Sequence, residues 1–139
     1  MKKRVIRQGV FETNSSSTHS LSISDSHNYI IIKTDEDNNI VISGEFKFGW
    51  GYDELYDFKD KVAYYYLDNM YDEDSIDFLK EVIIDETGAN DVIFDIDEEY
   101  SWIDHQSHGT TDGLTREELK DFLFNPNSYI ILKNDNDYD

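Results

Sequence analysis

The 139-residue sequence contains no cysteine, one proline and no long hydrophobic run. Without cysteine, disulfide bonds, thiolate zinc sites and cysteine nucleophiles are excluded. Behind the basic start at residues 1–4, the pair Val5-Ile6 is interrupted at once by Arg7, and no stretch approaches the length of a membrane span. We therefore expect a cytoplasmic protein that has no signal segment, does not enter a membrane and folds without covalent cross-links.

Positive charge is also scarce, because 12 Lys and Arg face 31 Asp and Glu and the net charge is −19. The imbalance is uneven: residues 1–24 carry +3, and residues 25–139 carry −22. Such a body repels nucleic acid backbones and anionic lipids and attracts basic protein surfaces. We expect no direct binding of nucleic acid, and a basic nucleic-acid-binding protein of a bacterial host as the partner.

Aromatic side chains, by contrast, are abundant, with 10 Tyr, 8 Phe and 2 Trp. A disordered acidic chain would be poor in these residues, because it could not offset the entropy of ordering its backbone. The length suits one domain. We divide it into a basic N-terminal segment 1–12, a hydroxyl-rich loop 13–20, an acidic α+β body 21–133 and a frayed acidic tail 134–139.

Alternating or β-branched runs predict the strands of this domain. The expected strands are residues 3–7, 21–23, 29–33, 40–42, 45–48, 91–96 and 127–133. The turn-forming cluster at residues 35–39 should join 29–33 and 40–42 into a β-hairpin, which residues 45–48 extend as a third strand.

Helices are predicted where apolar residues recur at three- and four-residue steps. Asp53 should cap a first helix that runs towards Met70, and a second helix should span residues 73–87 with Gly88 ending it. Thr115 and Glu118 form a capping box that opens a third helix. Together these elements predict an α+β fold, with an antiparallel or mixed β-sheet and about three helices packed on one face.

A hydroxyl-rich string follows the N-terminal strand, and residues 7–20 read RQGVFETNSSSTHS. Hydroxyls and loop amides beside an arginine can hold a phosphate or a nucleotide. The candidate ligands are Arg7, Asn14, Ser15, Ser16, Ser17, Thr18 and His19. The alternative is a self-bonded turn that locks the N-terminal strand against the sheet.

The same string resembles the N-terminal signature of uncharacterised proteins from Gram-positive bacteria and their phages. In that group a basic extended segment precedes the string Phe-Glu-Thr-Asn-Ser-Ser-Ser and a histidine. In this sequence the string is Phe11 to Ser17, and the histidine is His19. The resemblance covers about a tenth of the chain. It implies a bacterial or phage setting and carries no activity with it.

Two histidines three residues apart, His105 and His108, suit a divalent metal if His19 or His27 supplies a third ligand. A polar surface loop explains them as well. An EF-hand-like start at residues 35–39 fails, since Ile40 and Phe46 stand where glycine and the bidentate glutamate are required. We therefore assign no metal ligands and expect no cofactor.

Carboxylates gather at three places in the body: at the start of each of the first two helices and after the strand at 91–96. Those assigned to a partner-binding surface, with two aromatic anchors, are Asp53, Glu54, Asp57, Asp60, Asp72, Glu73, Asp74, Asp77, Trp50 and Tyr56. Such a density can imitate a phosphate track and steer a basic protein towards it. The alternative is an acidic surface that only keeps the protein soluble.

Two functions follow from these features. The first is an acidic, phage-type inhibitor that blocks a nucleic-acid-binding protein, such as a CRISPR or restriction defence nuclease, by mimicking nucleic acid charge. The second is a small enzyme or nucleotide-binding protein that uses the segment from Arg7 to His19. The first hypothesis favours a protein that is not an enzyme, and a structural protein of a virion is a third reading.

Overall fold

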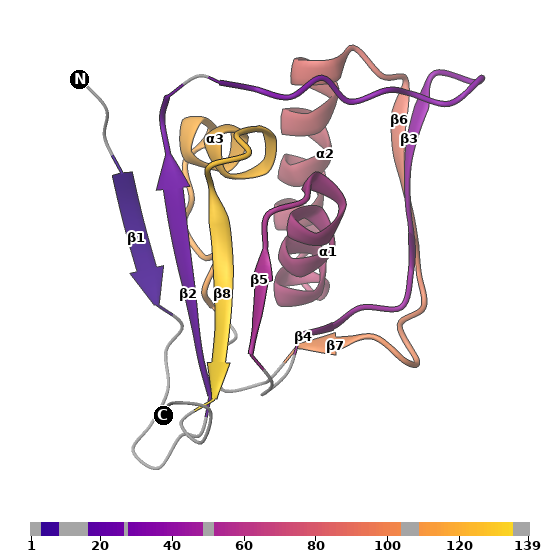
Figure 1. Ribbon diagram of the computed structural model, residues 1–139. Helices are drawn as coiled ribbons and strands as arrows, with labels where there is room; N and C mark the ends of the chain where they lie inside the picture. The colour runs from indigo at the N-terminus through magenta and orange to yellow at the C-terminus, as the bar shows by residue number, and fades with distance from the viewer. Residues whose placement is uncertain (1–3, 9–16, 27, 49–51, 104–108, 135–139) are drawn as a thin grey trace.

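A computed structural model describes residues 4–8, 17–26, 28–48, 52–103 and 109–134, and its strands form one larger sheet and two strand pairs (Figure 1). Within these residues the larger sheet has the order β1-β2-β8-β5 and is antiparallel throughout. Its strands are β1 (Arg4–Gln8), β2 (Ser17–Ser24), β8 (Tyr129–Asn134) and β5 (Asp53–Leu55).

The two smaller units are parallel strand pairs. One joins β3 (Asn39–Gly44) to β6 (Asp91–Ile96), and the other joins β4 (Lys47–Phe48) to β7 (Trp102–Ile103). Parallel neighbours need a long crossover between them, and here the crossover from β3 to β6 contains two helices.

The helices of the described residues are α1 (Phe58–Asn69), α2 (Glu73–Thr87) and α3 (Arg116–Phe124). Figure 1 shows α1 and α2 between the antiparallel sheet and the pair of β3 and β6, whereas α3 overlaps β2 and β8 in this view. The predicted α+β fold, with a mixed arrangement of strands and three helices on one face of the sheet, is confirmed.

The core lies where these helices meet the inner face of the sheet. Leu21 of β2 pairs with Ile130 of β8, which in turn pairs with Leu55 of β5, and all three side chains are buried. Tyr64, Leu79 and Phe122, one from each helix, are fully buried on the helical side. Burial of these side chains supplies the main driving force for folding.

The ends of α2 and α3 follow their local sequence. Gly88 adopts a left-handed conformation with φ of 74°, and its N–H donates to Ile84 O over 2.8 Å. At α3, the Thr115 hydroxyl accepts from Glu118 N (3.1 Å) while the Glu118 carboxylate accepts from Thr115 N (3.0 Å). The predicted helix end at Gly88 and the predicted capping box are therefore confirmed.

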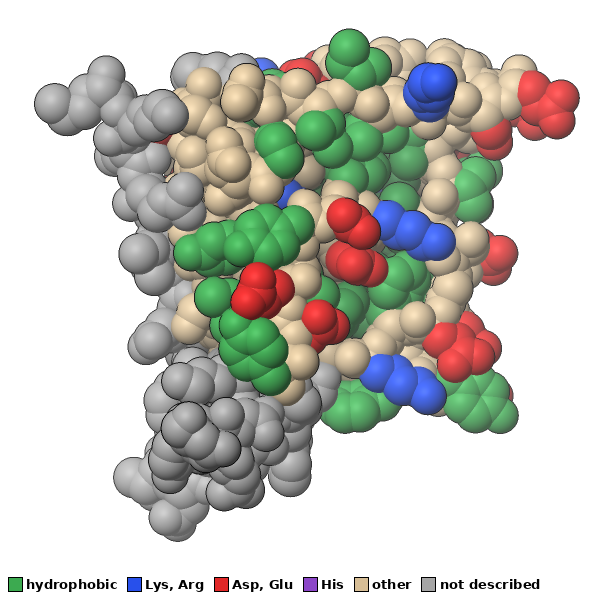
Figure 2. Space-filling model, in the orientation of Figure 1, with side chains coloured by type: hydrophobic (Ala, Val, Ile, Leu, Met, Phe, Trp, Pro, Cys, Tyr) green, Lys and Arg blue, Asp and Glu red, His purple; other side chains and the backbone are tan. Residues whose placement is uncertain are grey.

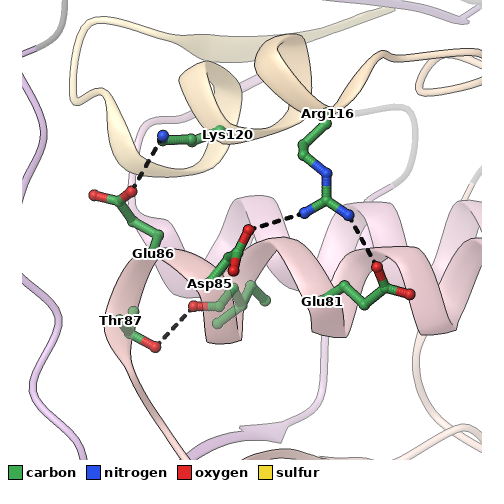
Figure 3. A network of polar contacts seen from close by, with 7 residues as sticks. Glu81, Asp85, Glu86, Thr87, Arg116 and Lys120 are labelled. Carbon is green, nitrogen blue, oxygen red and sulfur yellow. Dashed lines mark hydrogen bonds and ion pairs between the residues drawn. The ribbon is translucent and has the colours of Figure 1, made fainter.

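A polar network joins α2 to α3 on the surface (Figure 3). The guanidinium of Arg116 bridges Glu81 (2.9 Å) and Asp85 (3.2 Å), while Lys120 pairs with Glu86 at 3.5 Å. Ion pairs this exposed contribute up to about 1 kcal/mol each. They orient the two helices and leave the packing energy to the apolar side chains beneath.

The predicted hairpin of residues 29–33 and 40–42 is wrong. Residues 28–33 form no strand, and Ile30 N donates instead to Phe124 O at the end of α3 (2.9 Å). The turn at residues 35–39 does form, but β3 beyond it pairs with β6, which lies about fifty residues further along. Local turn chemistry fixed the turn, and the distant β6 provided the better pairing partner.

Three further boundaries also differ from the sequence prediction. The hydroxyl-rich loop 13–20 ends early, because Ser17 already starts β2, whose centre lies between β1 and β8. Asp53 does not cap a helix; it begins β5, and Asp57 precedes α1. The strand predicted at residues 45–48 is limited to β4, which pairs with β7 and so extends no hairpin.

Candidate functional site

The first cluster of predicted partner-binding residues forms at the free edge of the antiparallel sheet, around β5 and the start of α1. We call it the β5 patch, and it consists of Asp53, Glu54, Asp57 and Asp60 with Tyr52, Tyr56 and Tyr129. Figure 2 shows hydrophobic side chains bordered by carboxylates over this part of the molecule. Four of the predicted acidic residues are thus brought together by the turn between β5 and α1.

Three tyrosines give the β5 patch an aromatic face. Tyr56 packs edge-on against Tyr129, with ring centroids 5.1 Å apart, although they belong to segments more than seventy residues apart. The Tyr52 hydroxyl donates to the Glu54 carboxylate. Tyr56 retains 42% of its surface and Tyr52 55%, so both rings remain available to a partner.

In the β5 patch, partial burial and repulsion disfavour the ionised form of Asp60. The pKa of Asp60 is raised, first by partial burial and then by the negative charges of Asp57 and Asp53, while Lys59 acts in the opposite direction. The hydrogen bond to Glu54, followed by desolvation, raises the pKa of Tyr52. A positive group that approached here would relieve this repulsion.

The second cluster lies at the start of α2. Asp72 caps the helix: its carboxylate accepts from Asp74 N at 3.2 Å and from the Ser75 hydroxyl at 2.8 Å. Glu73, Asp74 and Asp77 follow on the first two turns and are exposed. Negative side chains at a helix N-terminus interact favourably with the helix dipole, so part of this acidity has a structural explanation.

A cavity of about 530 Å³ opens beside this second cluster, and we call it the α2 pocket. Its lining residues come from the end of α1, the start of α2 and the turn before α3. They are Tyr65, Asn69, Asp72, Asp74, Ser75, Phe78, Asp112, Gly113 and Leu114.

Asp68 in the last turn of α1 positions the turn that carries Asp112 and Gly113, two lining residues of the α2 pocket. Its carboxylate accepts hydrogen bonds from Gly109 N (2.8 Å), Thr111 N (2.9 Å) and the Thr111 hydroxyl (2.5 Å). These bonds hold the turn at residues 109–113 against α1. The sequence contains no local signal for this contact, because its partners lie about forty residues apart.

The β5 patch and the α2 pocket lie at opposite ends of α1. A helix of 12 residues spans about 18 Å, so the predicted acidic surface is divided into two sites. Trp50, the second predicted aromatic anchor, lies outside the described residues. Tyr129 also takes part in the β5 patch and was missed, since only the pairing of β5 with β8 brings it there.

The predicted phosphate-binding segment is not displayed as a loop where the structure describes it. His19 is completely buried, and its Nδ1 lies 2.7 Å from the Tyr64 hydroxyl of α1. Arg7 lies in β1, and Ser17 and Thr18 lie in β2. Asn14, Ser15 and Ser16 fall outside the described residues. A buried His19 offers no face to a ligand in solution, which favours the structural reading of this string.

A buried lysine, Lys61, was not singled out from the sequence. Only 1% of its surface is exposed, and its Nζ donates to Asn125 O and Ser128 O, both at 3.0 Å. Desolvation lowers the pKa of Lys61 to about 7, while the charge of Asp57 opposes the shift. The bonds of Lys61 to two backbone carbonyls tie α1 to the segment after α3, so we assign it a structural role.

Among the His, Asp and Glu side chains that the structure describes, no group of three is placed to hold a metal ion. His105, His108 and His27 lie outside those residues. In the same part of the chain, no helix combines the length and apolar character needed to cross a membrane.

Comparison with known proteins gives no relative on which to rest a function. No family model matches the chain, and neither the curated proteins nor the solved structures contain a match. Any function must therefore be argued from the two acidic sites themselves.

Proposed function

We propose that this protein is an acidic, phage-type inhibitor that binds a basic nucleic-acid-binding protein of a bacterial host and blocks it by imitating nucleic acid charge. The proposed target is a defence nuclease of the host, such as a CRISPR or restriction nuclease. The observation that carries the proposal is the β5 patch, in which four carboxylates surround exposed tyrosines at a sheet edge.

The composition of the β5 patch supports a protein interface more than a merely soluble surface. Tyrosines are favoured at protein interfaces because they bury a large area at little entropic cost, whereas a surface that serves only solubility gains nothing from exposed rings. Partial burial and then the negative charges of Asp57 and Asp53 raise the pKa of Asp60, and binding of Lys or Arg would remove the part that is due to repulsion.

The spacing of the two acidic sites also supports mimicry. They are separated by the length of α1, about 18 Å, which matches the axial rise of about five base pairs of duplex DNA. A protein groove that follows phosphates over that distance would meet carboxylates at both ends of α1. The net charge of −19 would accelerate the encounter at low salt.

A binding competition tests the proposal. The partner is recovered from a bacterial lysate at low salt, and its binding to this protein is then measured in the presence of duplex DNA. We expect the two to compete, and we expect affinity to fall steeply between low and physiological salt. Simultaneous binding of DNA and this protein would contradict the proposal, as would affinity that does not change with salt.

A pair of charge-reversal variants locates the effect. Asp53→Lys with Glu54→Lys should weaken partner binding by roughly a hundredfold or more, because opposed charges become like charges at the interface. The control variant carries Asp95→Lys and Glu99→Lys, at exposed positions in β6 and just after it. It changes the net charge by the same amount away from the β5 patch. Equal losses in both variants would mean that total charge, and not the β5 patch, governs binding.

A further inference from the structure

The α2 pocket combines negative charge, aromatic side chains and a buried acceptor to which no group in the described part of the chain donates. We infer that it binds a guanidinium group, supplied by an arginine side chain that the basic partner inserts at the end of α1. The chemistry of the pocket stands on its own residues; the assignment of the guanidinium to a partner protein rests on the proposed function.

Asn69 provides the observation that points to a ligand. Its side chain is more than nine-tenths buried, with 8% of the residue exposed, and it lines the α2 pocket. Its Nδ2 donates to Tyr65 O (2.9 Å) and to the Thr111 hydroxyl (2.8 Å). The Thr111 hydroxyl already donates to Asp68, so both neighbours of Nδ2 are acceptors and the orientation of the amide is fixed.

That orientation leaves the Asn69 Oδ1 without a donor among the described residues. A buried acceptor that makes no hydrogen bond destabilises the folded state. Since this oxygen belongs to a residue that lines an open cavity, a ligand that enters the pocket and carries N–H groups can satisfy it.

The charge of the α2 pocket selects a cation. Asp72, Asp74 and Asp112 line it, and neither lysine nor arginine does so in the described part of the chain. The nearest helical arginine, Arg116, is engaged by Glu81 and Asp85. Burial raises the pKa of Tyr65, which lines the pocket, and the charges of Asp72, Asp68 and Asp112 raise it further against a lowering bond to Ser75.

The shape and chemistry of the lining favour guanidinium over ammonium. Acceptors come from Asn69 and from carboxylates on separate elements, which suits a planar group that carries five donors. Phe78, which is only partly buried, adds aromatic surface on which such a plane can stack. One face of Phe78 already illustrates this contact, since the Arg116 guanidinium lies 5.7 Å from its ring centroid.

Nuclear magnetic resonance titration of the isolated protein tests the inference without any partner. The probes are Ac-Gly-Arg-Gly-NH2, the matching lysine peptide and free agmatine. We expect saturable shifts of the Asn69 side-chain amide and of the Gly113 backbone amide with the arginine peptide, and an affinity at least roughly fivefold weaker for the lysine peptide.

Variants assign the binding to the α2 pocket. Asp74→Asn and Asp112→Asn should each lower the affinity for the arginine peptide by roughly tenfold, about 1.4 kcal/mol. Asp77→Asn removes the same charge from the same helix outside the pocket lining and should change affinity less than twofold. Asp72 is left intact because it caps α2. Should Asp112→Asn alter the turn that carries it, Asp74→Asn still decides the question.

Several outcomes would overturn the inference. Shifts that do not saturate, equal binding of the two peptides or equal losses at Asp74 and Asp77 would show only diffuse attraction. Binding of agmatine without binding of the arginine peptide would assign the pocket to a free guanidino compound. If the arginine peptide does not bind but a partner competes with DNA, the guanidinium site is rejected and the proposed function stands. If the arginine peptide binds but no partner competes with DNA, the guanidinium site stands and the proposed function is rejected.

Discussion

At the scale of single residues, Lys61 occupies the environment least suited to its charge. Its Nζ donates hydrogen bonds to two carbonyl oxygens of the segment that follows α3, and the ring centroid of Phe122 lies 5.6 Å from Nζ. Carbonyls and an aromatic face compensate only part of the hydration that a buried ammonium loses. The folded protein therefore holds this proton less tightly than the unfolded chain does.

This difference predicts a pH-dependent stability. The pKa of Lys61 is about 7 when folded against 10.5 for an ordinary lysine, so between these values the unfolded chain binds more protons and stability rises with pH. The contribution is at most about 1.4 kcal/mol per pH unit. Urea unfolding from about pH 7 to 9.5 should show this rise for the native protein and not for Lys61→Met.

The exposed neighbour Lys59 supplies the control, because Lys59→Met should keep the native rise. Tyrosines oppose the rise at the upper end of this range, because burial and a bond to Glu98 raise the pKa of Tyr66 to about 12 in the folded state, above its ordinary value of 10.0. The native protein and both lysine variants share this contribution, so the comparison among them isolates Lys61. Parallel stability curves for the native protein and Lys61→Met would show that the lysine stays charged when buried.

His19 and Tyr64 form the second residue-scale prediction. Both are fully buried, and the Tyr64 hydroxyl lies 2.7 Å from Nδ1 of His19. Tyr64→Phe removes only the hydroxyl and should lower the free energy of unfolding by about 1–3 kcal/mol, because a buried ring nitrogen loses this partner. Tyr71→Phe, at a ring that is 91% exposed, should change it little. An unchanged stability in Tyr64→Phe would reopen His19 as a ligand.

At the scale of elements, the chain turns after α2 through Gly88. No atom lies within 4 Å of the position that a Cβ would take there, so a side chain meets no obstacle and only its φ of 74° is unfavourable. Gly88→Ala should cost about 1 kcal/mol, and Gly88→Asn should cost less because asparagine tolerates this conformation. Thermal unfolding checks both; a larger loss in Gly88→Asn than in Gly88→Ala would refute the conformational explanation.

Elements whose signals are local were predictable from the sequence. The capping box of Thr115 and Glu118, the end of α2 at Gly88 and the strand at 91–96 all depend on residues within a few positions of one another, and all are confirmed. In β2, the alternation of His19, Leu21 and Ile23 pointed to a strand with an inward histidine. That signal was outweighed by the serine-rich composition around it.

Elements defined by distant pairing were not predictable in this way. The run at 29–33 has the composition of a strand, yet the parallel pairing of β3 with β6 takes the place of the expected hairpin. The candidate site shows the same division. Asp72 and Asp74 could be proposed from the start of a helix, whereas Asn69 and Asp112 come together only through the bonds of Asp68 to the turn at 109–113.

At the scale of the whole molecule, the net charge of −19 works against the folded state, because folding brings like charges together. We predict that the melting temperature rises as sodium chloride is increased from about 0.02 to 0.5 M, which screens this repulsion. The variant with Asp95→Lys and Glu99→Lys should melt higher at low salt and respond less to salt. If the melting temperature of both proteins rises equally with salt, the rise does not come from screening of charge repulsion within the protein.

The position of β8 has a consequence for the order of events during synthesis. This strand comes last among the described elements, yet it lies between β2 and β5 at the centre of the antiparallel sheet. Until residues 129–134 have left the ribosome, β2 lacks one neighbour and β5 has nothing to pair with. The nascent chain can form its helices early, but the sheet that carries the β5 patch closes only after β8 has emerged.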